Sequence, residues 1–195
     1  ARFVDVVEPS PQIKMIEIKL SQGAKPGLGG LLPAAKVTAE IASLRGIPAG
    51  VDCWSPTAHS AFHDADTLLD FVELLASHSG LPVGIKSAVG QLDLFSDIAS
   101  LMADGERGVD FVNIDGGEGG TGAGPLVFTD HVALPFKIGF SRAYRVFAEA
   151  GVQDRIVFCG GGKLGLPESA LLAFALGCDT VNVGREAMLS IGCIQ

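Results

Sequence analysis

Short, nearly continuous apolar runs alternate along the chain with segments that have a helical hydrophobic period. The apolar runs cover residues 13–20, 82–87, 109–115, 155–159 and 180–184, and runs of this kind are typical of buried parallel strands. The segments with a helical period cover residues 66–78, 92–103, 140–150 and 167–176, and a glycine follows closely after each of them. We expect Asp66 and Thr67 to cap the first of these helices. This alternation predicts an α/β fold built from βα units.

Polar residues and glycines cluster where the predicted strands end. The groups concerned are Lys86, Asp115 to Gly117, Gly160 to Lys163, and Gly184 with Arg185. Functional groups at the carboxyl ends of parallel strands are typical of a (β/α)8 barrel of the TIM type. Only five strands are predicted where a barrel needs eight, and we expect no helix after the last one. The sequence therefore predicts a single incomplete barrel domain over residues 1–195, with further βα units before Ala1 and more chain after Gln195.

Composition restricts the class of protein. The chain has 195 residues, of which 48% are hydrophobic and 18% charged, so it is globular and can bury a sizeable core. A net charge of −8, with no basic face that carries aromatic residues, argues against nucleic-acid binding. The longest apolar stretch, residues 170–176, is too short to be a membrane segment. Four cysteines without Cys-x-x-Cys spacing indicate a reducing, cytoplasmic location, with Cys159 and Cys178 as buried apolar residues.

The segment 18–33 turns from an apolar strand into a glycine-rich loop with two lysines. Gly23 and Gly27 allow close approach of backbone N–H groups to a ligand, and Lys25 precedes a proline that restricts its backbone. These features favour a site for an anionic ligand. An ordinary glycine-rich connection is the alternative interpretation.

Two later glycine-rich strand ends lie where barrels bind phosphate. Gly160, Gly161 and Gly162 precede Lys163, and Gly184 precedes Arg185, in the positions expected for loops after the last two strands of a barrel. A flavin or another phosphorylated ligand is the predicted occupant. Tight turns that need a positive φ are the alternative.

Lys86 and the loop 115–123 point to a flat ligand beside a cation. A lysine inside an apolar strand must be paired or lose its charge, and a cation beside the pyrimidine edge of a flavin stabilises the reduced form. The loop places five glycines in nine residues, which permits close backbone approach. We interpret Asp115 and Glu118 as solvated carboxylates at its rim, with acid–base catalysis as the alternative.

Several of these motifs resemble one family. They are Gln22 to Gly27, the pattern Ser55-Pro56-x-x-His59, the loop 115–123, and Gly192 to Ile194. In order and over nearly the whole chain, they resemble the FMN-binding synthase domain of glutamate synthase, including its shorter stand-alone relatives. The resemblance implies a (β/α)8 barrel that holds FMN. On it 2-oxoglutarate and ammonia would form 2-iminoglutarate, which the reduced flavin would convert to L-glutamate.

The resemblance also assigns residues. It implies that Lys25 and Arg45 bind the carboxylates of 2-oxoglutarate and that Lys86 lies by the flavin ring as a catalytic residue. We expect the remaining cofactor contacts to come from Gln22, Gly116, Gly117, Gly160, Gly161, Gly162, Gly184 and Arg185. Cys193 would be the first of three ligands of a [3Fe-4S] cluster, with the other two beyond Gln195. An electron-donor subunit or domain is an implied partner.

Two apolar residues depart from the family pattern. Leu31 stands where the large enzymes usually have a glutamine, and Leu28 stands where they have an acidic residue. Other hypotheses therefore remain: an FMN barrel acting on another keto or hydroxy acid, or a catalytically silent barrel that serves as an assembly module. Because barrel strands are missing, we expect the segment alone to be inactive.

Overall fold

The computed structural model describes residues 2–119 and 124–193. Residues 120–123 of the predicted glycine loop, and Ile194 of the last family motif, lie outside the described residues. The chain forms two compact units, one of residues 1–26 with 60–195 and one of residues 27–59. The expectation of one domain over residues 1–195 stays a prediction.

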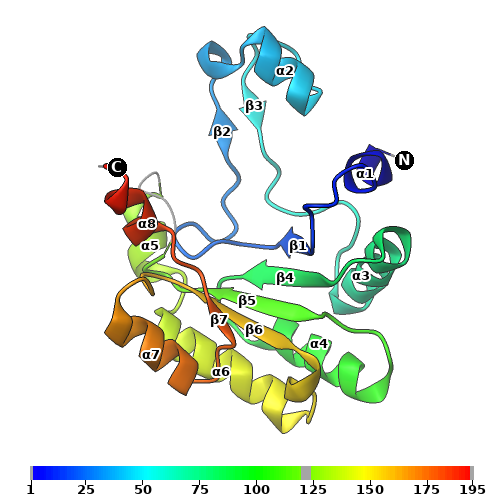
Figure 1. Ribbon diagram of the computed structural model, residues 1–195, viewed down its shortest axis with the longest axis vertical. Helices are drawn as coiled ribbons and strands as arrows, with labels where there is room; N and C mark the ends of the chain where they lie inside the picture. The colour runs from blue at the N-terminus through cyan, green and yellow to red at the C-terminus, as the bar shows by residue number, and fades with distance from the viewer. Residues whose placement is uncertain (1, 120–123, 194–195) are drawn as a thin grey trace. The chain divides into compact units, whose positions relative to one another are not determined.

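A five-stranded parallel sheet forms the centre of the larger unit (Figure 1). Its strands follow chain order: β1 (Ile16–Lys19), β4 (Val83–Ser87), β5 (Phe111–Asp115), β6 (Val157–Gly161) and β7 (Thr180–Val181). All five lie within or across the predicted apolar runs. Strand β6 extends two residues beyond its predicted end, so Gly160 and Gly161 belong to the sheet rather than to a loop.

Helices precede, connect and follow the strands of this unit. They are α1 (Arg2–Val7), α3 (Ala65–Ser79), α4 (Asp93–Asp104), α5 (Leu126–His131), α6 (Phe136–Glu149), α7 (Pro167–Ala175) and α8 (Arg185–Ser190), with a 3₁₀ turn at Gln153–Arg155. The predicted helices 92–103 and 167–176 are confirmed to within a residue. The expectation that no helix follows the last strand is wrong, because the residues directly after Gly184 form the short helix α8.

Two helices begin earlier than the sequence pattern suggested. Asp64, rather than Asp66 with Thr67, caps α3. The Asp64 side chain accepts a hydrogen bond from the backbone N–H of Thr67, and the Thr67 hydroxyl accepts one from the backbone N–H of Asp64. Helix α6 begins at Phe136, four residues before its predicted start, directly after Pro135. The prediction omits one residue of α3, Ala65, and the first turn of α6, residues 136–139, because hydrophobic periodicity does not define where a helix begins.

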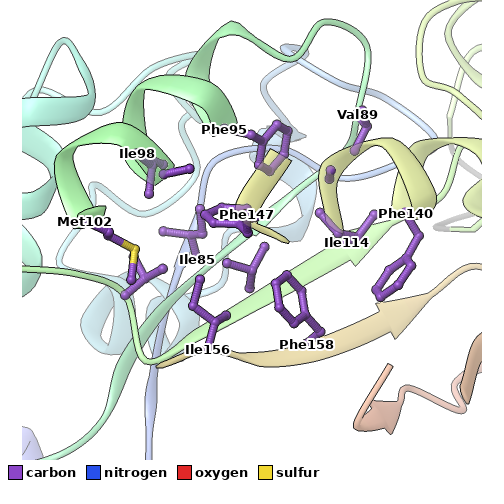
Figure 2. Close-up of a cluster of buried hydrophobic side chains, with 14 of the residues drawn as sticks. Ile85, Val89, Phe95, Ile98, Met102, Ile114, Phe140, Phe147, Ile156 and Phe158 are labelled. Carbon is purple, nitrogen blue, oxygen red and sulfur yellow. The ribbon is translucent and has the colours of Figure 1, made fainter. Parts of the chain in front are cut away.

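Aromatic side chains dominate the core between the sheet and the helices. Ile85 and Ile114 of the sheet pack with Phe95, Phe140 and Phe147 of α4 and α6 (Figure 2). Phe147 contacts the rings of both Phe95 and Phe158, with ring centroids 6.4 and 5.7 Å away. Burying one such side chain contributes about 1.5–3 kcal/mol, so this layer fixes the sheet that carries the site.

The smaller unit, residues 27–59, contains an antiparallel pair and one helix. Strands β2 (Leu31–Leu32) and β3 (Cys53–Trp54) pair, and between them lie a 3₁₀ turn (Ala34–Lys36) and helix α2 (Ala39–Arg45). The Thr38 side chain caps α2, and Gly46 ends it in the left-handed conformation with φ 65°. Among the described residues, no helix of either unit has the length and apolar character needed to cross a membrane.

Candidate active site

The side chains of the sheet alternate between two chemically different faces. Val83, Ile85, Val112 and Ile114 belong to the hydrophobic core with the helices. The residues between them, including Lys86, Asn113 and Asp115, project to the other face because the side-chain period of a strand is two. The face away from the helices is therefore the polar one. In a barrel this face is the interior wall, which becomes polar where it binds a ligand.

Lys86 and Asp115 form the charged centre of this face. The Lys86 Nζ atom lies 3.7 Å from Oδ2 of Asp115. The same oxygen accepts a hydrogen bond of 2.8 Å from the backbone N–H of Gly23, in the loop after β1. Asp115 is only 5% exposed, so its interpretation as a solvated rim carboxylate is wrong. It neutralises the lysine and ties the first glycine-rich loop to the end of β5.

Glu118 has a structural partner. Its two carboxylate oxygens accept hydrogen bonds of 3.0 and 2.8 Å from the backbone N–H of Phe136, the first residue of α6. A carboxylate at this position accepts a hydrogen bond from an otherwise free N–H of the first turn. The positive end of the helix dipole also stabilises its negative charge. Glu118 is half-buried in this role, so its interpretation as a solvated carboxylate is also wrong.

A cavity of about 190 Å³ lies at the carboxyl ends of the strands. Three of its side chains are cationic and two are carboxylates, and much of its wall is glycine. Its lining residues are Gln22, Lys86, Asp115, Gly119, Gly161, Gly162, Lys163, Asn182, Gly184, Arg185 and Glu186. Six of these (Gln22, Lys86, Gly161, Gly162, Gly184 and Arg185) are among the cofactor-binding residues predicted from the sequence.

The glycines of the cavity wall hold backbone segments close together. A Cβ on Gly119 would lie 2.7 Å from the Cα of Gly162, and a Cβ on Gly161 would lie 3.1 Å from Oδ1 of Asp115. Gly162 has φ 133°, which favours glycine, and Lys163 has φ 54° in the left-handed region. A lysine held in that conformation is uncommon, and such strain clusters at functional sites.

Other predicted cofactor residues support the cavity from outside. Gly160 faces the core, where a Cβ would lie 2.8 Å from Phe136 and 2.9 Å from Sγ of Cys178. A Cβ on Gly116 would lie 2.6 Å from the Phe136 side chain, and a Cβ on Gly117 would lie 2.8 Å from the Ala133 carbonyl oxygen. These three glycines do not line the cavity; their absent side chains allow the loops to pack.

The predicted substrate residues lie in different parts of the chain. Lys25 lies in the loop after β1, where its backbone N–H donates to the Gln22 carbonyl at 3.2 Å. Arg45 is the last residue of α2 in the smaller unit. That these two residues bind the two carboxylates of one substrate molecule stays a prediction.

The predicted cluster ligand lies near the end of the described chain. Cys193 is half-buried after α8, and its backbone N–H donates to the Met188 carbonyl at 3.0 Å. Within residues 2–119 and 124–193, no group of three or more His, Cys, Asp or Glu side chains could hold a metal ion. The iron–sulfur ligand role of Cys193 stays a prediction.

The two cysteines predicted to be buried are buried. Cys159 lies on β6 and Cys178 lies between α7 and β7, and both are free thiols. Burial raises the pKa of Cys159, and burial also raises the pKa of Cys178 to about 12. Both thiols are therefore neutral and unreactive at physiological pH.

The sequence pattern placed Lys163 in a glycine-rich strand end expected to bind phosphate, but it did not indicate Asn182 or Glu186 as polar residues of the cavity. Asn182 could have been found, because it lies two residues after Thr180 and continues the polar face of β7. The sequence pattern indicated Asp115 as a solvated residue, whereas the structure buries it.

Comparison with solved structures identifies the fold class of this chain. The chain is similar to solved structures of flavocytochrome b2, a double mutant with sulfite bound and a double mutant with pyruvate bound, with TM-scores of 0.55 and 0.54. These similarities cover 94% of this chain and 39% and 40% of the flavocytochrome chains, at 15% and 17% identity. Together with the five parallel strands, they show an α/β fold of the TIM-barrel type, present in part.

Sequence comparison gives the family. Residues 7–195 match the model described as the conserved region in glutamate synthase. The glutamate synthase large subunit-like protein YerD of Bacillus subtilis is 37% identical over 184 residues, which are 94% of this chain and 35% of that protein. The archaeal glutamate synthase [NADPH] of Methanocaldococcus jannaschii is 38% identical over 91% of this chain and 34% of its own length. The chain belongs to the glutamate synthase family, and it spans about a third of the length of these curated relatives.

Proposed function

We propose that this chain is the cofactor-binding part of an FMN-dependent oxidoreductase that reduces 2-iminoglutarate, formed from 2-oxoglutarate and ammonia, to L-glutamate. The observation that carries the proposal is the cavity at the carboxyl ends of β4 to β7, with Lys86 and Asp115 paired at its base. Family membership supports the reaction, and the location of the cavity supports a cofactor site.

The residues of the cavity fit FMN. Gly119, Gly161, Gly162 and Gly184 leave a wall without side chains, which a flat ring or a phosphate can approach closely. Lys163 and Arg185 supply positive charge at the rim, where barrels hold a phosphate group. Bound FMN would supply hydride transfer.

Lys86 and Asp115 act together in this proposal. The carboxylate fixes the ammonium group at the base of the cavity through the 3.7 Å contact, while the Gly23 N–H holds the carboxylate from the other side. An ammonium group there stabilises negative charge that develops on an adjacent ligand. Lys86 is 27% exposed as a side chain, so its charge retains access to the ligand.

Lys25 and Arg45 are the proposed groups for the two carboxylates of 2-oxoglutarate. Arg45 can hold a carboxylate through two parallel hydrogen bonds, whereas Lys25 contributes a point charge. Leu28 and Leu31 are 40% and 45% exposed in the smaller unit. Because both side chains are apolar, a less polar keto acid is the alternative substrate to test.

The experiment uses the full-length protein. The purified protein should carry a flavin absorption spectrum and should form L-glutamate from 2-oxoglutarate and ammonium when a reduced electron donor is supplied. A panel of keto acids tests the substrate, and Arg45→Ala should weaken 2-oxoglutarate binding about 10-fold while the FMN content stays unchanged. A colourless protein would contradict the flavin site, and faster turnover of another keto acid would contradict the substrate.

A further inference from the structure

Three polar side chains form a hydrogen-bonded chain across the polar face of the sheet. The Asn113 Nδ2 atom donates to Oε2 of Glu17 at 2.7 Å, and Nδ2 of Asn182 donates to Oδ1 of Asn113 at 3.0 Å. Glu17 lies on β1, Asn113 on β5 and Asn182 just after β7, so the chain spans the sheet from one edge to the other. Gly84 of β4 lies opposite Glu17 in the register and adds no side chain between them.

The direction of this chain follows from the chemistry of its first member. A carboxylate only accepts hydrogen bonds, so Asn113 must turn its NH₂ group towards Glu17. Its carbonyl oxygen then faces Asn182 and requires a donor, so Asn182 must also present its NH₂ group to the network. Asn113 is 6% exposed and lies within a central strand, so the partners of its amide group, rather than bulk water, set the orientation of that group.

One atom of Asn182 remains for the cavity. Asn182 lines the cavity, and its Oδ1 atom accepts no hydrogen bond from the residues that the structure describes. We infer that Glu17 and Asn113 are positioning residues that turn the Asn182 carbonyl oxygen towards the cavity, where it accepts a hydrogen bond from an N–H group of the bound ligand. The inference rests on the proposed function for the identity of that ligand.

The acceptor complements the other groups of the cavity. Lys86, Lys163 and Arg185 can only donate hydrogen bonds to a ligand, and the carboxylates of Asp115 and Glu186 are the charged acceptors of the cavity. The Asn182 Oδ1 atom is a neutral acceptor, which suits an uncharged N–H donor. Two sources offer such a donor: the imide N3–H of a flavin ring, and the N–H of ammonia or of an imine substrate.

Glu17→Gln tests the direction of the chain in the full-length protein. A glutamine side chain can donate as well as accept, so both asparagine amides can turn over and Asn182 can then present NH₂ to the cavity. We expect ligand binding to weaken about 5-fold, which is the loss of one neutral hydrogen bond. Glu149→Gln, on the exposed end of α6, makes the same charge change away from the polar face and should leave binding unchanged.

The binding assays separate the two donor sources. If the donor is the flavin N3–H, apo-protein binds 3-methyl-FMN about 5-fold more weakly than FMN, and Glu17→Gln removes that difference. If the donor is the substrate, FMN affinity stays constant and the KM for ammonium rises in Glu17→Gln. Asn182→Ala should reproduce either effect and add little to it in the double variant, because both changes remove one interaction.

A measurement without ligand keeps the inference independent of the proposed function. In protein labelled with ¹⁵N-asparagine, the side-chain NH₂ signals of Asn113 and Asn182 should both shift in Glu17→Gln and stay in place in Glu149→Gln. An unchanged Asn182 signal, or unchanged binding of both FMN and ammonium, would overturn the inference. A wild-type protein that binds no FMN but shows the coupled signals would contradict the proposed function alone.

Discussion

Removal of the Asp115 carboxylate should destabilise the fold by an amount set by its two contacts. In Asp115→Ala, the buried N–H of Gly23 loses its acceptor at 2.8 Å, which costs about 1.5–3 kcal/mol for a charge-assisted bond. Lys86 loses its partner at 3.7 Å, and because the lysine is 27% exposed this adds about 1 kcal/mol or less. The expected loss in the free energy of unfolding is about 1.5–4 kcal/mol.

Asp115→Asn is the matched variant. Its amide oxygen can still accept from Gly23, so only the charge is lost and the expected cost is about 1 kcal/mol. Urea unfolding of the flavin-free full-length protein, followed by circular dichroism, measures both variants without a contribution from ligand binding. Equal stabilities for Asp115→Ala and Asp115→Asn would refute the conclusion that the hydrogen bond from the Gly23 N–H makes the larger contribution of Asp115 to the free energy of unfolding.

Three further predictions concern the sheet and its core. Gly84→Ala should prevent folding, because a Cβ there would lie 2.3 Å from the Phe111 carbonyl oxygen; Gly105→Ala, whose nearest contact is at 3.5 Å, should yield soluble protein of normal melting temperature. Phe147→Ala should lower the free energy of unfolding by about 3–5 kcal/mol in urea titration, and a loss below 1 kcal/mol would contradict the packing of Figure 2. Because the folded-state pKa of Cys178 is raised from 9.0 to about 12, the contribution of this thiol to stability should be constant below pH 9 and fall between pH 9 and 12, by up to about 1.4 kcal/mol per pH unit. Cys178→Ala should show a shallower fall, and equal slopes for the two proteins would contradict the burial of the thiol.

Much of the larger unit could be predicted from hydrophobic periodicity. Parallel strands buried by helices read as continuous apolar runs, which is why β4 and β5 were located to within two residues. Glycines at strand ends identified most of the cavity wall. Periodicity carries no signal for capping, however, so Asp64 and the first turn of α6 were missed.

The smaller unit could not be predicted, because its elements are too short to show a period. Strands β2 and β3 have two residues each, and the unit is held by local hydrogen bonds such as that from the Ala34 N–H to Oδ1 of Asp52 at 2.6 Å. Within the site, sequence position identified Lys86 but not its partner. The burial of Asp115 depends on the Gly23 loop, which meets it only in three dimensions.

Occupation of the cavity by a side chain tests its assignment as the flavin site most directly. Gly184 lines the cavity, and a Cβ built on it meets no atom within 4 Å, so Gly184→Leu should leave the fold and melting temperature of the ligand-free protein unchanged. Gly105→Leu, at the end of α4, is the control for an added leucine. In a fluorescence titration of full-length apo-protein, we expect Gly184→Leu to weaken FMN binding by about 100-fold or more, while Gly105→Leu binds FMN as the wild type does. A folded Gly184→Leu protein with wild-type FMN affinity would show that the flavin binds elsewhere.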